Sequence, residues 1–206
     1  MTADRAAAAG LPHQNVHSRY LRMTHWINAL ATLIMVGSGW QIYNASPLFG
    51  FTFPKAVTLG GWLAGGLLWH FAAMWLFLIN GAVYVTVGLV TGHFQQKFLP
   101  IRPAEVVRDL YAAITGRLSH ADLGRYNAVQ KLIYTCVVLT GAVIVASGFA
   151  LWKPVQLREV AALFGGYEGA RLVHFFAMSV IALFLVVHVA MALLVPKSLR
   201  AMIRGH

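Results

Sequence analysis

The stretch that decides the fold of this chain is Leu172-Val-His-Phe-Phe-Ala-Met-Ser-Val-Ile-Ala-Leu-Phe-Leu-Val-Val-His-Val-Ala-Met-Ala-Leu-Leu-Val195, an apolar run that contains two histidines. Its length exceeds the roughly 20 apolar residues that an α-helix needs to cross a bilayer. His174 and His188 lie fourteen residues apart, which on an α-helix is a rise of about 21 Å and leaves the side chains about 40° apart. They therefore share one face at two depths, too far apart to bind one metal ion but suitably placed for two separate cofactors.

The composition of the whole chain is that of a membrane protein. Of its 206 residues, 59% are hydrophobic and 11% are charged, a balance that argues against a soluble domain. Three further segments are long and apolar enough to span, at about 24–43, 57–91 and 132–151. The second is longer than a bilayer needs, so it must tilt or protrude. The sequence therefore predicts an all-α integral membrane protein, a four-helix transmembrane bundle surrounded by membrane lipid.

The net charge of +10 is distributed unevenly along the chain. With four spans, the tail 1–18, the loop at about 92–125 and the tail 201–206 lie on one side, with the span ends beside them. That side carries twelve of the sixteen basic residues: Arg5, Arg19, Arg22, Lys97, Arg102, Arg108, Arg117, Arg125, Lys131, Lys197, Arg200 and Arg204. The other side carries Lys55, Lys153, Arg158 and Arg171. By the positive-inside rule we expect both termini to be cytoplasmic, around one domain at 19–200, and no nucleic-acid partner.

The nine histidines divide by their position relative to the spans. Five lie outside the spans or at their edges and are expected to be solvated: His13, His17, His93, His120 and His206. The other four lie within the apolar segments. Because an ionisable residue inside a membrane is costly, a functional role is the first hypothesis for each of them.

The depths of these four histidines predict two pairs. His70 and His174 each lie twenty-two residues from the cytoplasmic end of their span, whereas His25 and His188 lie six and eight residues from it. At about 1.5 Å per residue, the first two belong to the outer half of the membrane and the last two to the inner half. Depth therefore pairs His25 with His188 and His70 with His174.

Two histidine pairs at two depths are the pattern of a protein that holds two b-type haems, each iron ligated by two histidines from different helices. The single cysteine, Cys136, lies inside the third span, which excludes covalent attachment through CxxCH. Cys136 is expected to pack as a small apolar residue. A single intramembrane histidine is more often a hydrogen-bonded packing or proton-handling group, and that alternative stays open here.

Small and basic residues near these histidines are compatible with haem binding. Glycine lets a flat macrocycle approach the backbone, although helix packing explains small residues equally well. The glycines concerned are Gly37, Gly39, Gly65, Gly66, Gly141 and Gly148. Arg22 and Arg171 each precede a proposed ligand by three residues, and we expect them to bind haem propionates, with topogenic charge as the alternative. No internal repeat is apparent.

These residues resemble a known family. The chain from about 17 to 200 resembles the four-helix bacterial di-haem cytochrome b subunits that anchor formate dehydrogenase, nickel–iron hydrogenase and thiosulfate reductase. The main anchors are His25-Trp26, the histidine pair of the last span, and Tyr126-Asn-Ala-Val-Gln-Lys131, which is similar to a YNAxQK segment of the formate dehydrogenase subunits. The resemblance implies that Asn127 contacts a quinone beside the inner haem, with Gln130 and Lys131 nearby. The alternative for Asn127 is a helix N-cap.

The resemblance also implies a function. We expect electron transfer through two haem b groups between the membrane quinone pool and a periplasmic redox subunit, a molybdenum oxidoreductase, in the bacterial inner membrane. The first alternative is a self-contained superoxide:quinone oxidoreductase on the same scaffold, with Lys153, Arg158 and Arg171 supplying steering charge. The second is a haem-free transporter that uses its histidines as a pathway.

Overall fold

The computed structural model describes residues 19–115 and 126–204, and every element in these ranges is a helix. The tail 1–18, the end of the central loop, and His13, His17, His120 and His206 lie outside the described residues. The elements are α1 (Arg19–Ala45), the 3₁₀ helix η1 (Lys55–Val57), α2 (Leu63–Val90), α3 (His93–Phe98), α4 (Pro103–Ile114), α5 (Ala128–Trp152), α6 (Arg158–Leu163), α7 (Gly166–Leu194) and α8 (Pro196–Arg204).

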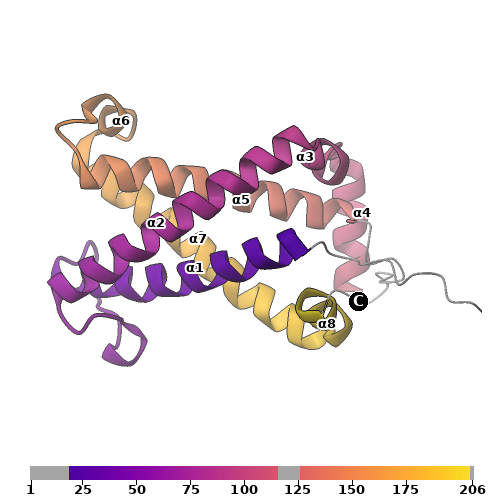
Figure 1. Cartoon of the computed structure of the whole chain (residues 1–206), viewed down its shortest axis with the longest axis horizontal. Helices are drawn as coiled ribbons and strands as arrows, with labels where there is room; N and C mark the ends of the chain where they lie inside the picture. Colours follow the sequence, from indigo (N-terminus) through magenta and orange to yellow (C-terminus); the bar gives the residue numbers. More distant parts are fainter. Residues whose placement is uncertain (1–18, 116–125, 205–206) are drawn as a thin grey trace, which may run out of the picture.

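Four long helices form two antiparallel hairpins. α1 packs along α2 and α5 packs along α7, while packing between the two hairpins is sparser (Figure 1). The short helices α3, α4 and α8 gather at the end where α1 begins, and α6 lies at the opposite end (Figure 1). The described ends of the chain therefore lie at the same end of the molecule, as four consecutive antiparallel long helices require.

Length and composition make three of the described helices candidate membrane spans: α2 with 28 residues, α5 with 25 and α7 with 29. Each is long enough to cross a hydrocarbon core of about 30 Å. α1 has a sufficient 27 residues but is less apolar, because polar side chains such as Asn28 and Gln41 lie along it. The multi-pass membrane protein is thus supported, while the crossing of α1 remains a prediction.

The second span begins later than the sequence suggested. The predicted start at residue 57 falls in η1, and the continuous helix begins only at Leu63. The reason is the Gly60-Gly61 pair, whose φ values of 113° and 73° lie in the left-handed region that favours glycine. The chain turns at this pair before entering α2, so residues 57–62 precede the helix, whose 28 residues still exceed the length that a bilayer needs.

The aromatic outer loop between α1 and α2 folds back on the end of the bundle. Asn44 binds the backbone of Phe53 twice, donating through Nδ2 to its carbonyl and accepting through Oδ1 from its amide, each at 2.8 Å. Tyr43, only 8% exposed, stacks on Phe175 at 5.2 Å between ring centroids. Phe49 of the loop also contacts Phe175, at 5.3 Å between ring centroids, so the loop packs against α7 at the residue that follows His174.

Helices at the opposite end were only partly foreseen. Val106, Val107, Leu110 and Ile114 recur at helical spacing and predict an amphipathic helix at about 103–115, which α4 confirms. α8 is not predicted from the sequence, because Pro196 ends the apolar run, but proline also fits the first position of a new helix. Cys136, expected to pack as a small apolar residue, is exposed on α5 and is not enclosed by the described residues.

Two histidine pairs between the hairpins

The structure brings together the two histidine pairs predicted by depth. The rings of His25 on α1 and His188 on α7 lie 5.9 Å apart between centroids and are inclined at 59°. The rings of His70 on α2 and His174 on α7 lie 6.4 Å apart and are inclined at 66°. In each pair one histidine comes from the α1–α2 hairpin and the other from α7, so both pairs bridge the seam between the hairpins.

The spacing within each pair fits a metal ion held between two imidazoles. A bond from a metal ion to an imidazole nitrogen is about 2 Å long. Two such bonds in line, together with the distance from each nitrogen to its ring centre, place the centroids about 6 Å apart. Both observed separations match that value. The residues present therefore fit two bis-histidine haem irons, one at each depth.

Serine hydroxyls contact the two outer rings in the same way. Ser38 Oγ lies 3.1 Å from Nδ1 of His70, and Ser147 Oγ lies 3.0 Å from Nδ1 of His174. Both serines are fully buried. Each hydroxyl also donates to the carbonyl four residues before it in its own helix, Ser38 at 2.6 Å and Ser147 at 2.7 Å. The outer pair is thus held from both sides by equivalent contacts from α1 and α5.

Glycine follows each of these serines and borders the same ring. A Cβ built on Gly39 would lie 3.5 Å from Cε1 of His70, and one on Gly148 would lie 3.3 Å from Cε1 of His174. The pocket at this level is lined by both histidines with Met35, Met74, Phe77 and Ile144. The other glycines noted from the sequence lie against loops or α1, or in open space: Gly37, Gly65, Gly66 and Gly141.

The inner pair has aromatic surroundings. Trp26 meets His25 edge-on at 5.3 Å between ring centroids, and Phe184 stacks on His188 at 5.4 Å with an interplanar angle of 25°. The backbone beside His25 is fixed from α2, because the buried amide Nδ2 of Asn80 donates to the carbonyl of Thr24 at 2.8 Å. Sequence reasoning missed Asn80, although a polar residue within an apolar span is itself a signal.

The two arginines expected to bind propionates have different surroundings. Arg171 donates to Glu168 at 3.0 Å and to the carbonyl of Ser46 at 2.7 Å, so it joins α7 to the first outer loop. Arg22 donates through Nη1 to the carbonyl of Ile203 in α8 at 2.9 Å. The Nε of Arg22 is buried without a hydrogen-bond partner among the described residues. Arg22 thus retains a buried N–H donor that could bind a carboxylate, whereas Arg171 is already bound to the carboxylate of Glu168.

The segment expected to contact a quinone begins α5 with a capping box. The Asn127 side chain accepts from the Gln130 amide at 2.8 Å, and Gln130 Oε1 accepts from the Asn127 amide at 3.1 Å. Asp109 of α4 accepts from the next backbone amide, that of Ala128, at 2.9 Å. Lys131 Nζ donates to the carbonyl of Pro100 at 3.5 Å. The N-cap alternative for Asn127 therefore holds, and it leaves the Nδ2 amide protons of Asn127 outside the cap.

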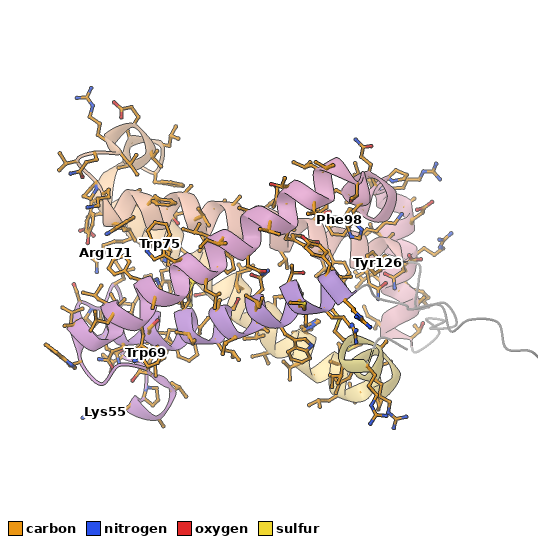
Figure 2. The ribbon with its side chains drawn as sticks, in the orientation of Figure 1. Lys55, Trp69, Trp75, Phe98, Tyr126 and Arg171 are labelled. Carbon is orange, nitrogen blue, oxygen red and sulfur yellow. The ribbon has the colours of Figure 1, made fainter. Side chains whose placement is uncertain are left out.

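Aromatic side chains gather next to this cap. Tyr126 packs edge-on against Tyr134 at 5.0 Å between ring centroids, and Phe98 of α3 contacts both tyrosines. Figure 2 shows Phe98 and Tyr126 at one end of the molecule, with Arg171 at the other. Burial raises the pKa of Tyr126, so its phenol stays protonated at neutral pH. This end of α5 therefore combines an amide, phenols and apolar rings.

Comparison with known proteins places all four histidines within matched sequence. The chain matches the prokaryotic cytochrome b561 family over residues 16–205. It is also 51% identical over 191 residues to the putative protein-methionine-sulfoxide reductase subunit YedZ1 of Azospira oryzae. That alignment covers 93% of this chain and 96% of the relative.

Proposed function

The chain belongs to the prokaryotic cytochrome b561 family, and from this premise we propose that it carries electrons between the quinone pool and a periplasmic oxidoreductase through two haems. Membership confirms the bacterial cytochrome b family that the histidines and the Tyr126–Lys131 segment resembled. It identifies a multi-pass membrane protein that uses haem b for electron transfer, as a subunit acting with others. The number of haems, the quinone and the partner are our proposal.

Two histidine pairs carry the proposal. His25 and His188 would hold the inner haem iron, and His70 and His174 the outer one, because the centroid spacing of each pair leaves room for a metal ion between two imidazoles. When bound, haem b accepts and releases one electron at a time. The two pairs lie at levels separated by about 21 Å of helix rise along α7. The chain thus holds two redox centres in series across an apolar bundle that excludes water.

The relative's name indicates the partner. YedZ1 of Azospira oryzae is described as a subunit of a protein-methionine-sulfoxide reductase. By that likeness, the periplasmic partner of this chain reduces methionine sulfoxide, in keeping with the molybdenum oxidoreductase expected from the sequence. The electrons balance: a quinol gives two electrons and two protons, and methionine sulfoxide with two electrons and two protons gives methionine and water. Quinol is oxidised at the inner pair, and electrons leave near the outer pair.

Charge at the outer end favours a protein partner over superoxide. Arg158 donates to Glu159 at 2.8 Å and lowers the pKa of that carboxyl below its ordinary value. Arg171 is paired with Glu168. Two of the three basic residues proposed to steer superoxide are therefore neutralised by neighbours, and such a field attracts a small anion weakly. We place electron entry at the quinone for this reason.

The quinone site we propose lies at the start of α5 beside the inner pair. Asn127 Nδ2 donates to a quinone carbonyl while Asn127 Oδ1 keeps its capping bond. Tyr126, Tyr134 and Phe98 supply flat apolar surface for the quinone ring. Gln130 and Lys131 support this end of the helix through their bonds to Asn127 and Pro100.

Reoxidation in whole cells tests the function. Anaerobic cells that contain the chain are reduced until the haem b absorption is stable, and a peptide containing methionine sulfoxide is then added. Rapid reoxidation that is lost in a strain lacking the chain supports the proposal. No reoxidation, together with reduction of the purified protein by enzymatically generated superoxide, would favour the superoxide alternative. Absence of any haem spectrum would favour the haem-free transporter.

A further inference from the structure

Ser38 and Ser147 form a matched pair of contacts that the proposed electron transfer does not by itself require. They lie on different hairpins, each is followed by glycine, and each meets Nδ1 of one outer histidine at about the same distance. Neither serine is exposed. Because the same arrangement occurs twice at one depth, we attribute to the serine contact a role in the histidine that it touches.

Each serine fixes which nitrogen of its histidine carries the proton. A serine hydroxyl has one hydrogen to donate. At 2.6 Å and 2.7 Å from the carbonyls of Ile34 and Val143, the two hydroxyls donate that hydrogen to the backbone. Towards the ring, each Oγ is therefore an acceptor, and Nδ1 of the histidine must be the donor.

This assignment leaves one nitrogen without a proton on each outer ring. With the proton on Nδ1, the lone pair of each outer imidazole is on Nε2, the nitrogen left to bind a metal ion.

We propose that Ser38 and Ser147 are positioning residues that hold both outer histidines as the Nδ1–H tautomer and lower the reduction potential of the outer haem. This inference rests on the proposed function. A histidine that donates from Nδ1 to an oxygen becomes a more basic ligand at Nε2. A more basic ligand stabilises ferric over ferrous iron, so two such bonds lower the potential.

Redox titration of purified Ser38→Ala, Ser147→Ala and the double variant tests the proposal. Each single variant should shift the midpoint of the outer haem upwards, and the double variant should shift it further, while the inner haem keeps its midpoint. Ser179→Ala is the matched control, because Ser179 makes the same backbone bond, to Phe175 at 2.8 Å, on the helix that carries both α7 ligands. Its midpoints should equal those of the wild type.

The outcomes separate this inference from the proposed function. An unshifted outer midpoint in the double variant, with two haems retained, overturns the role of the serines and leaves the electron-transfer proposal intact. A wild-type protein without two haems overturns the electron-transfer proposal itself. Where an alanine variant loses the outer haem, the cysteine variant of the same position keeps a side chain of the same shape with a weaker acceptor. It should show a smaller upward shift, and an unchanged midpoint there also overturns the inference.

Discussion

His174 and His188 project from the same helix, yet their surroundings differ. Around the outer pair, serine hydroxyls meet both rings and glycines leave room beside them. Around the inner pair, Trp26 and Phe184 contact the rings, and an amide from α2 fixes the backbone next to His25. One pair is held by short hydroxyl contacts, and the other lies among aromatic rings.

The difference follows the depth of each pair. The outer histidines lie beside two fully buried serines, Ser38 and Ser147, so a ring N–H there finds its acceptor in the protein. Serine next to glycine meets that need, because both side chains are small. At the end where α3, α4 and α8 gather, longer polar side chains make the contacts: Arg22 donates to the Ile203 carbonyl of α8, and Asn127 caps α5. Helix ends there provide backbone carbonyls and amides as partners.

Replacing the histidines should have the largest effect and should distinguish the outer pair from the inner pair. His70→Ala and His174→Ala should each remove the outer haem, whereas His25→Ala and His188→Ala should each remove the inner one. The reason is that one remaining imidazole cannot complete bis-histidine ligation. Reduced-minus-oxidised spectra should therefore fall into two groups. If His25→Ala and His70→Ala abolished the same spectral component, the pairing would be wrong.

Replacing Asn127, at the start of α5, should affect only the reduction of haem by quinol. Asn127→Ser retains an N-cap oxygen but loses the amide donor. Loss of a hydrogen bond worth about 1 kcal/mol should slow haem reduction by quinol about fivefold, with both haem spectra unchanged. Stopped-flow kinetics measures the rate.

The matched control for Asn127→Ser is Gln130→Ala. It breaks the other half of the capping box and keeps the Asn127 amide. Quinol kinetics slowed equally in the two variants would show that only the cap matters at this position.

The side-chain amides of Asn80 and Asn44 should have smaller effects, at opposite ends of the bundle. Asn80→Ala removes a bond between α2 and α1, and such bonds within membranes average about 0.6 kcal/mol. We expect a small loss of stability, with inner haem released at a lower temperature than in the wild type. Asn44→Ala, which frees the outer loop from Phe53, should instead lower the release temperature of the outer haem. Thermal titration followed by absorption distinguishes them, and identical profiles would contradict the separate roles.

The smallest effect is expected from a single methyl group beside the outer pair. In Gly148→Ala, the added Cβ lies 3.3 Å from Cε1 of His174, so the ring must move by a few tenths of an ångström. Gly141→Ala, on the same helix with nothing within 4 Å of its Cβ, is the control. Only the first variant should alter the absorption maximum of the outer haem, and an unaltered spectrum would mean that the ring moves aside freely.

Hydrophobicity and helix rise were sufficient to predict the long helices and the histidine pairs. His25 and His188 are 163 positions apart in the sequence. They could be paired because the depth of each histidine follows from its distance to the end of its own span. The amphipathic helix α4 was predictable for a similar reason, since its apolar residues recur at helical spacing.

Contacts across the seam were beyond such reasoning. Ser38-Gly39 and Ser147-Gly148 form a repeated pair too short to stand out as a repeat, and their meaning depends on which way each helix is rotated. The bond from the Ala128 amide to Asp109 depends on where the loop returns. Depth predicts what lies at one level, whereas rotation and loop paths decide which atoms touch.

The number of haems per chain tests the central claim most directly. Pyridine haemochrome absorption of the purified wild-type protein, divided by protein determined through amino-acid analysis, counts non-covalent haem b without reference to any partner. Two histidine pairs with the spacing of axial ligands predict two haems per chain. A value of one, with every chain folded, would contradict the account, because one histidine pair would then be a packing contact and no second redox centre would exist across the bundle.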